Sequence, residues 1–96
     1  MRVRYTKTAL AEIDEICSYI SKDNPVAAAN VAAAIERTIA AIAKRPKLAP
    51  IVHDGTVHAK LVERFQYRVF YEVVGQELII RNVRSTRRLR PWEQEG

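Results

Sequence analysis

The segment Leu61 to Arg90, LVERFQYRVFYEVVGQELIIRNVRSTRRLR, contains two strand-like stretches followed by a run of arginines. Tyr67–Val74 and Glu77–Arg84 are rich in β-branched and aromatic residues, and Gly75-Gln76 joins them. A two-residue connection that begins with Gly favours a type II′ turn, because Gly accepts a positive φ at the first central position. The segment therefore predicts a β-hairpin. Its predicted pairs are Val74 with Glu77, Tyr71 with Ile80, Phe70 with Arg81 and Tyr67 with Arg84.

Alternation along the two strands divides the hairpin into two faces of different character. The first face is apolar and should lie on the core, with more polar residues at its open end. Its members are Val69, Tyr71, Val73, Leu78 and Ile80, followed by Tyr67, Asn82 and Arg84. The second face mixes Phe70, Ile79 and Val83 with Arg68, Glu72 and Arg81. A half-apolar, half-charged face is weakly covered or kept for a partner, so we expect function there and in the arginines that follow.

Length and composition indicate one globular domain over residues 1–96. The 96 residues are 48% hydrophobic and 28% charged, which is ordinary for a chain with one small core. The formal charge is +5, and no acidic residue interrupts Arg81–Arg90, so this part should attract polyanions or acidic proteins. A single cysteine excludes an internal disulfide. No segment has the pattern of a signal peptide or a bilayer span, and we expect a cytoplasmic protein.

The remainder of the chain predicts further elements before the hairpin. In order they are a strand over Arg2–Tyr5, a helix over Thr8–Ser21, a helix from Pro25 to about Lys44, a loop over Pro46–Gly55 and a strand over His58–Phe65. Thr6 or Thr8 should cap the first helix and Asn24 the second. The order β-α-α-β-β-β predicts an α+β fold: a small, mainly antiparallel β-sheet with an N-terminal α-helical hairpin packed on one face.

The chain offers few residues for a cofactor or a metal. Its only glycines are Gly55, Gly75 and Gly96, which excludes a glycine-rich phosphate loop. His53 and His58 lie in or beside a loop, whereas structural zinc needs about four closely spaced ligands. Cys17 fits the apolar stripe of the first helix as a small core residue. We therefore expect no cofactor and no metal site.

An RNA-cleaving site would need a base, an acid and a cation for the developing phosphorane charge. Glu63, Tyr71, Arg81 and Arg84 supply these residue types. However, Tyr71 is assigned to the core face, and the register of the strand that carries Glu63 is undefined. No catalytic residue is assigned, and whether the chain is an enzyme stays open.

The arginines have two interpretations. The set consists of Arg64, Arg68, Arg81, Arg84, Arg87, Arg88 and Arg90. Guanidinium groups can make bidentate contacts to carboxylates or phosphates. Alternatively, they form a solvated sheet edge with surface ion pairs such as Glu72 with Arg81, each of which stabilises little. Because the hairpin and the tail gather several of them at one end, we favour a binding surface.

Nearly the whole chain resembles small toxins of the ParE/RelE superfamily from bacterial type II toxin-antitoxin systems, above all the ParE-like, plasmid-stabilisation branch. The resemblance rests on VRYTKTALAEIDEICSYI (3–20), NPVAAANVAAAIERTI (24–39), and FQYRVFYEVVGQELIIRNVRSTRR (65–88) ending in RPW (90–92). It implies a toxin that a cognate antitoxin holds inactive. ParE-like members are associated with inhibition of DNA gyrase, whereas RelE-like members cleave mRNA on the ribosome. Both branches share the fold, so residues must distinguish them.

This sequence departs from both branches near its end. ParE-like members often carry a His between the last strand and the paired arginines, where this chain has Ser85 in Arg84-Ser85-Thr86-Arg87-Arg88. Ribonuclease members commonly place a Tyr or His near the end, where this chain has Leu89, Pro91 and Trp92. The departures weaken the ribonuclease interpretation most, and they leave open whether this copy is actively toxic.

The resemblance also implies partners. An acidic C-terminal segment of the antitoxin should lie on the second hairpin face, with DNA gyrase as the target or, alternatively, mRNA on the ribosome; no membrane partner is expected. The expected antitoxin- or target-binding residues are Arg64, Arg68, Phe70, Arg81, Arg84, Arg87 and Arg88. A second alternative is a non-toxic nucleic-acid-binding module, although only Tyr67 and Trp92 could stack on bases.

Overall fold

The predicted hairpin lies within the sheet and contributes most of its core face. The structure, a computed structural model, describes residues 1–93. Strand β4 (Tyr67–Val74) runs antiparallel to β5 (Glu77–Ser85). Gly75 has a φ of 60°, as the predicted turn requires at its first central position. The predicted pairs Val74 with Glu77 and Tyr71 with Ile80 are confirmed.

The predicted register is wrong beyond Ile80, where a β-bulge shifts the pairing by one residue. The pairs predicted as Phe70 with Arg81 and Tyr67 with Arg84 are instead Phe70 with Asn82 and Tyr67 with Ser85. The physical reason is burial. A regular strand would turn Asn82 and Arg84 toward the core, whereas the extra residue turns Val83 inward. Val83 is 1% exposed and belongs to the main core, so its prediction on the second face is also wrong.

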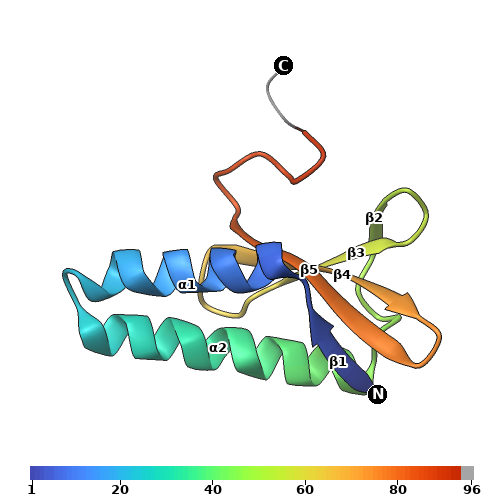
Figure 1. The fold of residues 1–96 in the computed structure, drawn as a ribbon, viewed down its shortest axis with the longest axis horizontal. Coiled ribbons are helices and arrows are strands. Elements are labelled where there is room, and N and C mark those ends of the chain that lie inside the picture. Colours follow the sequence, from blue (N-terminus) through green and yellow to red (C-terminus); the bar gives the residue numbers. More distant parts are fainter. Residues whose placement is uncertain (94–96) are drawn as a thin grey trace.

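Five strands form one sheet in the order β1-β5-β4-β3-β2 (Figure 1). Strand β1 (Arg2–Tyr5) is parallel to β5, and the other pairs are antiparallel, which confirms the mainly antiparallel α+β fold. Two boundaries differ from the prediction. Strand β2 (Ile51–His53) lies inside the predicted loop. Strand β3 (Val57–Leu61) ends before Phe65 because the chain turns at Arg64, which has a φ of 71°.

The two helices lie side by side and antiparallel (Figure 1). Helix α1 (Lys7–Ser21) is capped by Thr6, and α2 (Pro25–Lys44) by Asn24, as predicted; each cap side chain accepts a hydrogen bond of 3.0 Å from a backbone N–H three residues on. The apolar stripe of α2 packs against the apolar face of β4 and β5. The main buried members of this core are Val31, Ile35, Ile39, Ile42, Val69, Tyr71, Leu78 and Ile80.

Helix α2 is long and apolar enough, by length and composition alone, to cross a bilayer, which the sequence analysis did not expect. Its buried stripe on the sheet accounts for this hydropathy, since Ile35 and Ile39 are 2% and 4% exposed.

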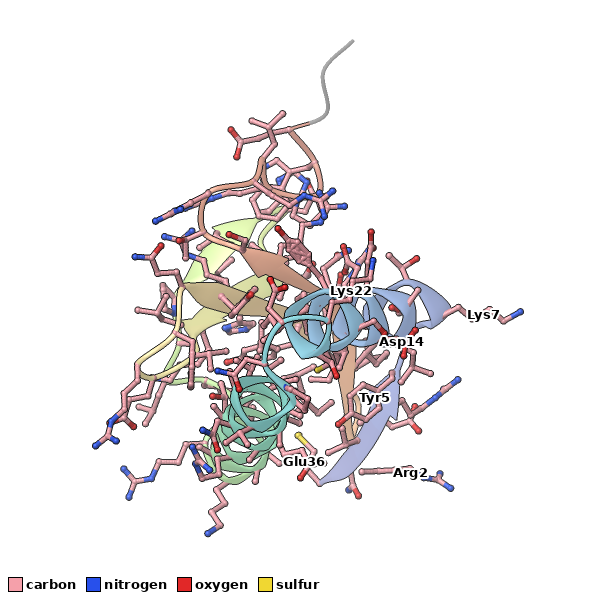
Figure 2. All side chains as sticks on the ribbon, turned by 90° about the vertical axis from the view of Figure 1, so that its left-hand side faces the viewer. Arg2, Tyr5, Lys7, Asp14, Lys22 and Glu36 are labelled. Carbon is pink, nitrogen blue, oxygen red and sulfur yellow. The ribbon has the colours of Figure 1, made fainter. Side chains whose placement is uncertain are left out.

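Figure 2 looks along the helices and shows Arg2 and Lys7 extending away from the protein body. Partial burial, together with the carboxylate of Glu36, raises the pKa of Tyr5 on β1.

Side chains of α1 and its cap complete the edge of β5. Strand β1 pairs only with Glu77–Ile80, so the following part of this edge has no strand beside it in the described chain. Thr6 Oγ1 donates to the Arg81 carbonyl oxygen at 2.8 Å while it accepts from Ala9 N at 3.0 Å. One hydroxyl thus caps α1 and also donates to a carbonyl oxygen of the sheet.

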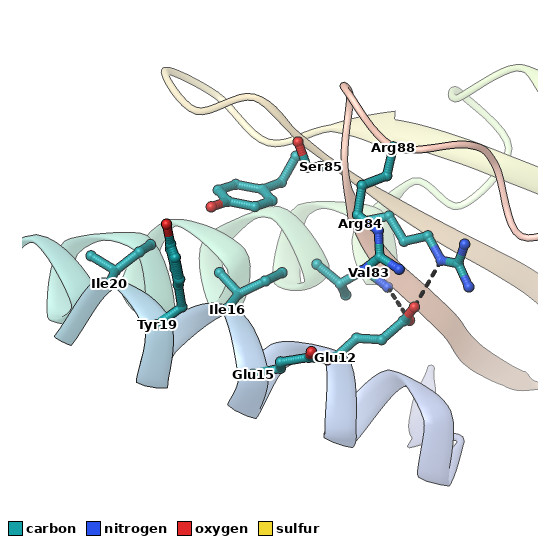
Figure 3. Close-up of a pocket in the computed structure, with 10 residues that line it drawn as sticks. Glu12, Glu15, Ile16, Tyr19, Ile20, Val83, Arg84, Ser85 and Arg88 are labelled. Carbon is teal, nitrogen blue, oxygen red and sulfur yellow. Dashed lines mark hydrogen bonds and ion pairs between the residues drawn. The ribbon is translucent and has the colours of Figure 1, made fainter. Parts of the chain in front are cut away.

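Glu12 takes the place of a neighbouring strand two residues further along β5, at the backbone of Val83 (Figure 3). Glu12 Oε1 accepts from the backbone N–H of Val83 at 3.0 Å and from Asn82 Nδ2 at 3.1 Å, and Oε2 accepts from Arg84 Nε at 2.8 Å. The side chains of Glu12 and Arg84 are 11% and 17% exposed. Ions so removed from water persist only where charge and hydrogen bonds compensate them. Glu12 therefore fastens the bulged end of β5 to α1.

We predict that Glu12→Ala lowers the free energy of unfolding by about 2–4 kcal/mol, because it leaves a backbone N–H, an amide and a guanidinium without their acceptor. The exposed neighbour Glu15 provides the control, and Glu15→Ala should change stability by less than about 0.5 kcal/mol. Urea unfolding followed by circular dichroism measures both. Equal stabilities of the two variants would contradict the anchoring role of Glu12.

Candidate functional site

The predicted arginines do not form one surface of unpaired positive charge, because two of them already have carboxylate partners. Arg84 pairs with Glu12, and its Nη1 also donates to the Leu89 carbonyl oxygen at 3.2 Å. Arg81 pairs with Glu72 on the neighbouring strand, as the surface-ion-pair alternative expected, and half of its side chain remains exposed. Arg84 is thus part of the scaffold. Arg81 still presents charge to solvent beside an acidic neighbour.

Arg87 and Arg88 are exposed in the turn that follows β5. Arg88 lines a cavity of about 400 Å³ between α1 and the end of β5, together with Tyr19, Tyr67 and Glu15 (Figure 3). Tyr19 is 69% exposed, and Ile16 and Ile20 form part of the apolar lining. This end of the molecule therefore combines exposed guanidinium groups with an apolar hollow, which suits contact with another macromolecule.

Arg64 and Arg68 lie at the same open end of the hairpin as Arg87 and Arg88, because Tyr67 pairs with Ser85 and the Thr86 N–H donates to the Gln66 carbonyl oxygen. Arg64 is exposed in the turn between β3 and β4, and its φ of 71° holds the chain in the left-handed region. Arg68 pairs across the sheet with Leu61 and lines a second groove, of about 500 Å³, with Arg45, Lys60 and Arg90. The predicted residues therefore form two pairs at the open end of the hairpin: Arg87 and Arg88 follow β5, with Arg88 lining the cavity beside α1, whereas Arg64 and Arg68 belong to the β3–β4 segment, with Arg68 lining the second groove.

Phe70 was expected on an exposed second face of the hairpin, but its side chain is buried there. It is 2% exposed and packs with Val57 and Ala59 beneath Trp92. The rings of Trp92 and Phe70 meet edge to face with centroids 5.5 Å apart, and Trp92 also stacks on His53 at 4.1 Å. The tail after β5 thus closes this face, and a partner can reach Phe70 only if Trp92 moves.

The groups considered for RNA cleavage lie apart in different environments. Tyr71 is fully buried, its hydroxyl donates to the Pro46 carbonyl oxygen at 2.6 Å, and burial raises its pKa. A phenol held in this way keeps its proton. Glu63 is exposed and lines a cavity with Arg37 and Lys60, whereas Arg84 lines the cavity beside α1. The described residues do not bring a base, an acid and a free cation together.

Other reactive side chains have structural settings. Burial, and to a smaller extent Asp14, raises the pKa of the Cys17 thiol, which opposes formation of the thiolate nucleophile. His58 is 8% exposed, its Nδ1 lies 2.8 Å from the Ala49 carbonyl oxygen, and its ring stacks on Tyr71. His58 therefore ties the α2–β2 connection to β3.

Sequence reasoning missed two residues that shape the site. Helical periodicity puts Glu12 on the polar side of the first helix, opposite its apolar stripe, and gives no sign that its carboxylate reaches β5. Trp92 was considered only as a group that could stack on bases. The one signal was its isolation: a single Trp after a predicted last strand, near a mixed face, commonly covers apolar surface.

The comparisons with known proteins agree with this architecture. The family described as ParE toxin of type II toxin-antitoxin system, parDE, matches residues 3–90. Y4kP, a candidate toxin of Sinorhizobium fredii (strain NBRC 101917 / NGR234), is 49% identical over 45 residues, which cover 47% of this chain and 47% of Y4kP. The match therefore spans about half the length of this curated relative.

A solved structure supports the fold independently of sequence. A chain of the chromosomal ParDE TA system from P. aeruginosa superposes with a TM-score of 0.78 and 18% identity, covering 88% of this chain and 95% of that chain. At this identity the likeness shows the fold alone. The family match over residues 3–90 carries the assignment: this chain belongs to the ParE toxin family of type II toxin-antitoxin systems.

Proposed function

We propose that this chain, as one domain over residues 1–96, is a cytoplasmic toxin that inhibits DNA gyrase and that a cognate antitoxin neutralises. The observation that favours gyrase over mRNA cleavage is the dispersal of the groups that cleavage would need. Tyr71 is buried and hydrogen-bonded, and Arg84 is committed to Glu12. This dispersal favours a toxin that acts by binding, for which the exposed arginines provide charge.

The antitoxin part of the proposal rests on family and charge. The match to the parDE toxin family supports a partner protein, and the solved relative is a ParDE TA system. The formal charge of +5 and the exposed guanidinium groups favour an acidic segment as the neutralising element. Arg64, Arg68, Phe70, Arg81, Arg84, Arg87 and Arg88 remain the predicted antitoxin- or target-binding residues, with Arg84 acting through its support of the β5 end.

Induction of this protein in a bacterium tests the target. We expect plasmid supercoiling to change within minutes while bulk translation, followed in the same culture, is initially intact. Prompt loss of translation with cut mRNA would contradict gyrase inhibition and would favour the RelE-like alternative. Unchanged growth and supercoiling in cells that contain the folded protein would contradict its toxicity.

Arg87 and Arg88 are the residues that we assign to the target. The double variant Arg87→Glu/Arg88→Glu should relieve growth arrest by at least about tenfold in colony counts after induction, because reversed charges at an interface cost several kcal/mol. The double variant Lys7→Glu/Lys22→Glu makes the same change of net charge at exposed positions at the two ends of α1 and should remain toxic. Equal toxicity of the two double variants would exclude the arginine pair from target binding.

Arg81→Glu tests the hairpin face as an antitoxin contact. The substitution places a second carboxylate beside Glu72 and should repel an acidic segment, so the Kd for the antitoxin should rise more than about tenfold. Antitoxins of this family are usually encoded beside their toxins, so the purified product of the adjoining reading frame serves as the ligand. Isothermal titration measures its Kd, with Lys7→Glu as the matched control. An unchanged Kd would remove Arg81 from the interface.

A further inference from the structure

A groove lies between the C-terminal end of α2 and the β2–β3 side of the sheet. Its volume is about 500 Å³, and its lining is mostly apolar, with Ala41, Ala49 and Pro50 among its members. Two large aliphatic side chains in this lining are exposed: Leu48 by 72% and Leu61 by 54%. Side chains of this size in a hollow at the surface lose contact with water when a partner fills the groove.

The rim of the groove carries positive charge alone. Arg45, Lys60, Arg68 and Arg90 line it, and none of its lining residues is acidic. Among residues 1–93, only Arg90 of these four has a carboxylate within 4.0 Å, that of Glu93 at 3.8 Å. Arg45, Lys60 and Arg68 therefore differ from Arg81 and Arg84, whose charges are matched inside the chain. Their charge is available to a partner.

The backbone beside the groove provides a third element of recognition. Strand β2 pairs with β3 only as far as Ile51 with His58, and the Ala59 N–H donates to the Pro50 carbonyl oxygen at 3.1 Å. Within the described chain no strand follows alongside Lys60 and Leu61 on this side. An uncovered length of sheet edge is a template for an extended peptide, whose alternate side chains would point into the groove and toward the rim.

We propose that this groove binds an acidic, extended peptide segment that inserts aliphatic side chains between Leu48 and Leu61 and pairs carboxylates with Arg45, Lys60 and Arg68. The occupant is a segment of the antitoxin, so the inference rests on the proposed function and adds a second docking site away from Arg81. Nucleic acid fits less well. The groove exposes aliphatic rather than aromatic groups, and its one aromatic side chain, Tyr71, is fully buried.

Two matched pairs of variants test the charge and the apolar contact separately. Arg45→Glu/Arg68→Glu reverses two rim charges, and Lys7→Glu/Lys22→Glu makes the same change elsewhere at exposed positions. Leu61→Ser removes an apolar contact, and Leu10→Ser does so at a residue of the same 54% exposure on α1. All four alter exposed or partly exposed side chains, and thermal unfolding verifies that each variant is folded.

The probe is the full-length purified product of the adjoining reading frame, titrated into each variant. We expect the Kd to rise at least about tenfold for each groove variant and less than about threefold for each control. Equal affinities of groove and control variants, with tight wild-type binding, would overturn the groove while leaving the proposed function intact. Absence of wild-type binding would overturn the proposed neutralisation and the groove with it.

A second probe separates the peptide from nucleic acid. The Kd of a single-stranded RNA oligonucleotide is measured for the wild type and for both double variants. Arg45→Glu/Arg68→Glu should raise this Kd no more than the control Lys7→Glu/Lys22→Glu does. If only the groove variant loses RNA affinity while its antitoxin affinity is unchanged, the groove is a phosphate-binding surface and the proposal is wrong.

Discussion

The carboxylate of Glu12 is the contact on which the functional end of this protein depends. It receives the Val83 N–H, the Asn82 amide and the Arg84 guanidinium, and so it substitutes for a neighbouring strand where β1 has ended. The bulge at Arg81 makes these contacts possible, because it turns the Val83 side chain into the core and leaves polar groups at the edge of β5, where they meet α1. Helix, strand end and following turn are thereby held as one unit.

The same arrangement sorts the arginines by role. Arg84 forms an ion pair with Glu12 that stabilises the fold, and Arg81 forms one with Glu72. Arg45, Lys60 and Arg68, in contrast, have no carboxylate within 4.0 Å among residues 1–93. Trp92 meanwhile covers Phe70 and removes the one aromatic residue of the predicted mixed face from solvent. Exposed charge beside exposed apolar surface is therefore concentrated in two hollows, one beside α1 and one beside β2 and β3, rather than along the mixed face. This distribution underlies the separate assignments of target and antitoxin contacts.

Local chemistry made much of the fold predictable. Asn24 with Pro25, Thr6, and Gly75 each act through their nearest neighbours, and the caps and the hairpin turn followed from them. The bulge had one sequence signal as well: a regular strand places the polar Asn82 and Arg84 on the core face after Leu78 and Ile80, and leaves the apolar Val83 outside it. Strand β2 was hidden by prolines, and Glu12 by its place on the polar side of a helix. Their roles arise from tertiary contacts, which periodicity within one element does not encode. The sequence predicted which arginines belong to the candidate site. Which of them are paired within the chain and which are free to bind a partner depended on those tertiary contacts.

Amide hydrogen exchange at Val83 tests the role of Glu12 most directly. If the carboxylate replaces a strand, the Val83 amide in the wild type should be protected to nearly the same degree as those of Leu78 and Ile80. In Glu12→Gln, protection at Val83 should fall selectively, while that at Leu78 is retained. Rapid exchange of Val83 in the wild-type protein, at the rate of the exposed turn around Gln76, would contradict the account.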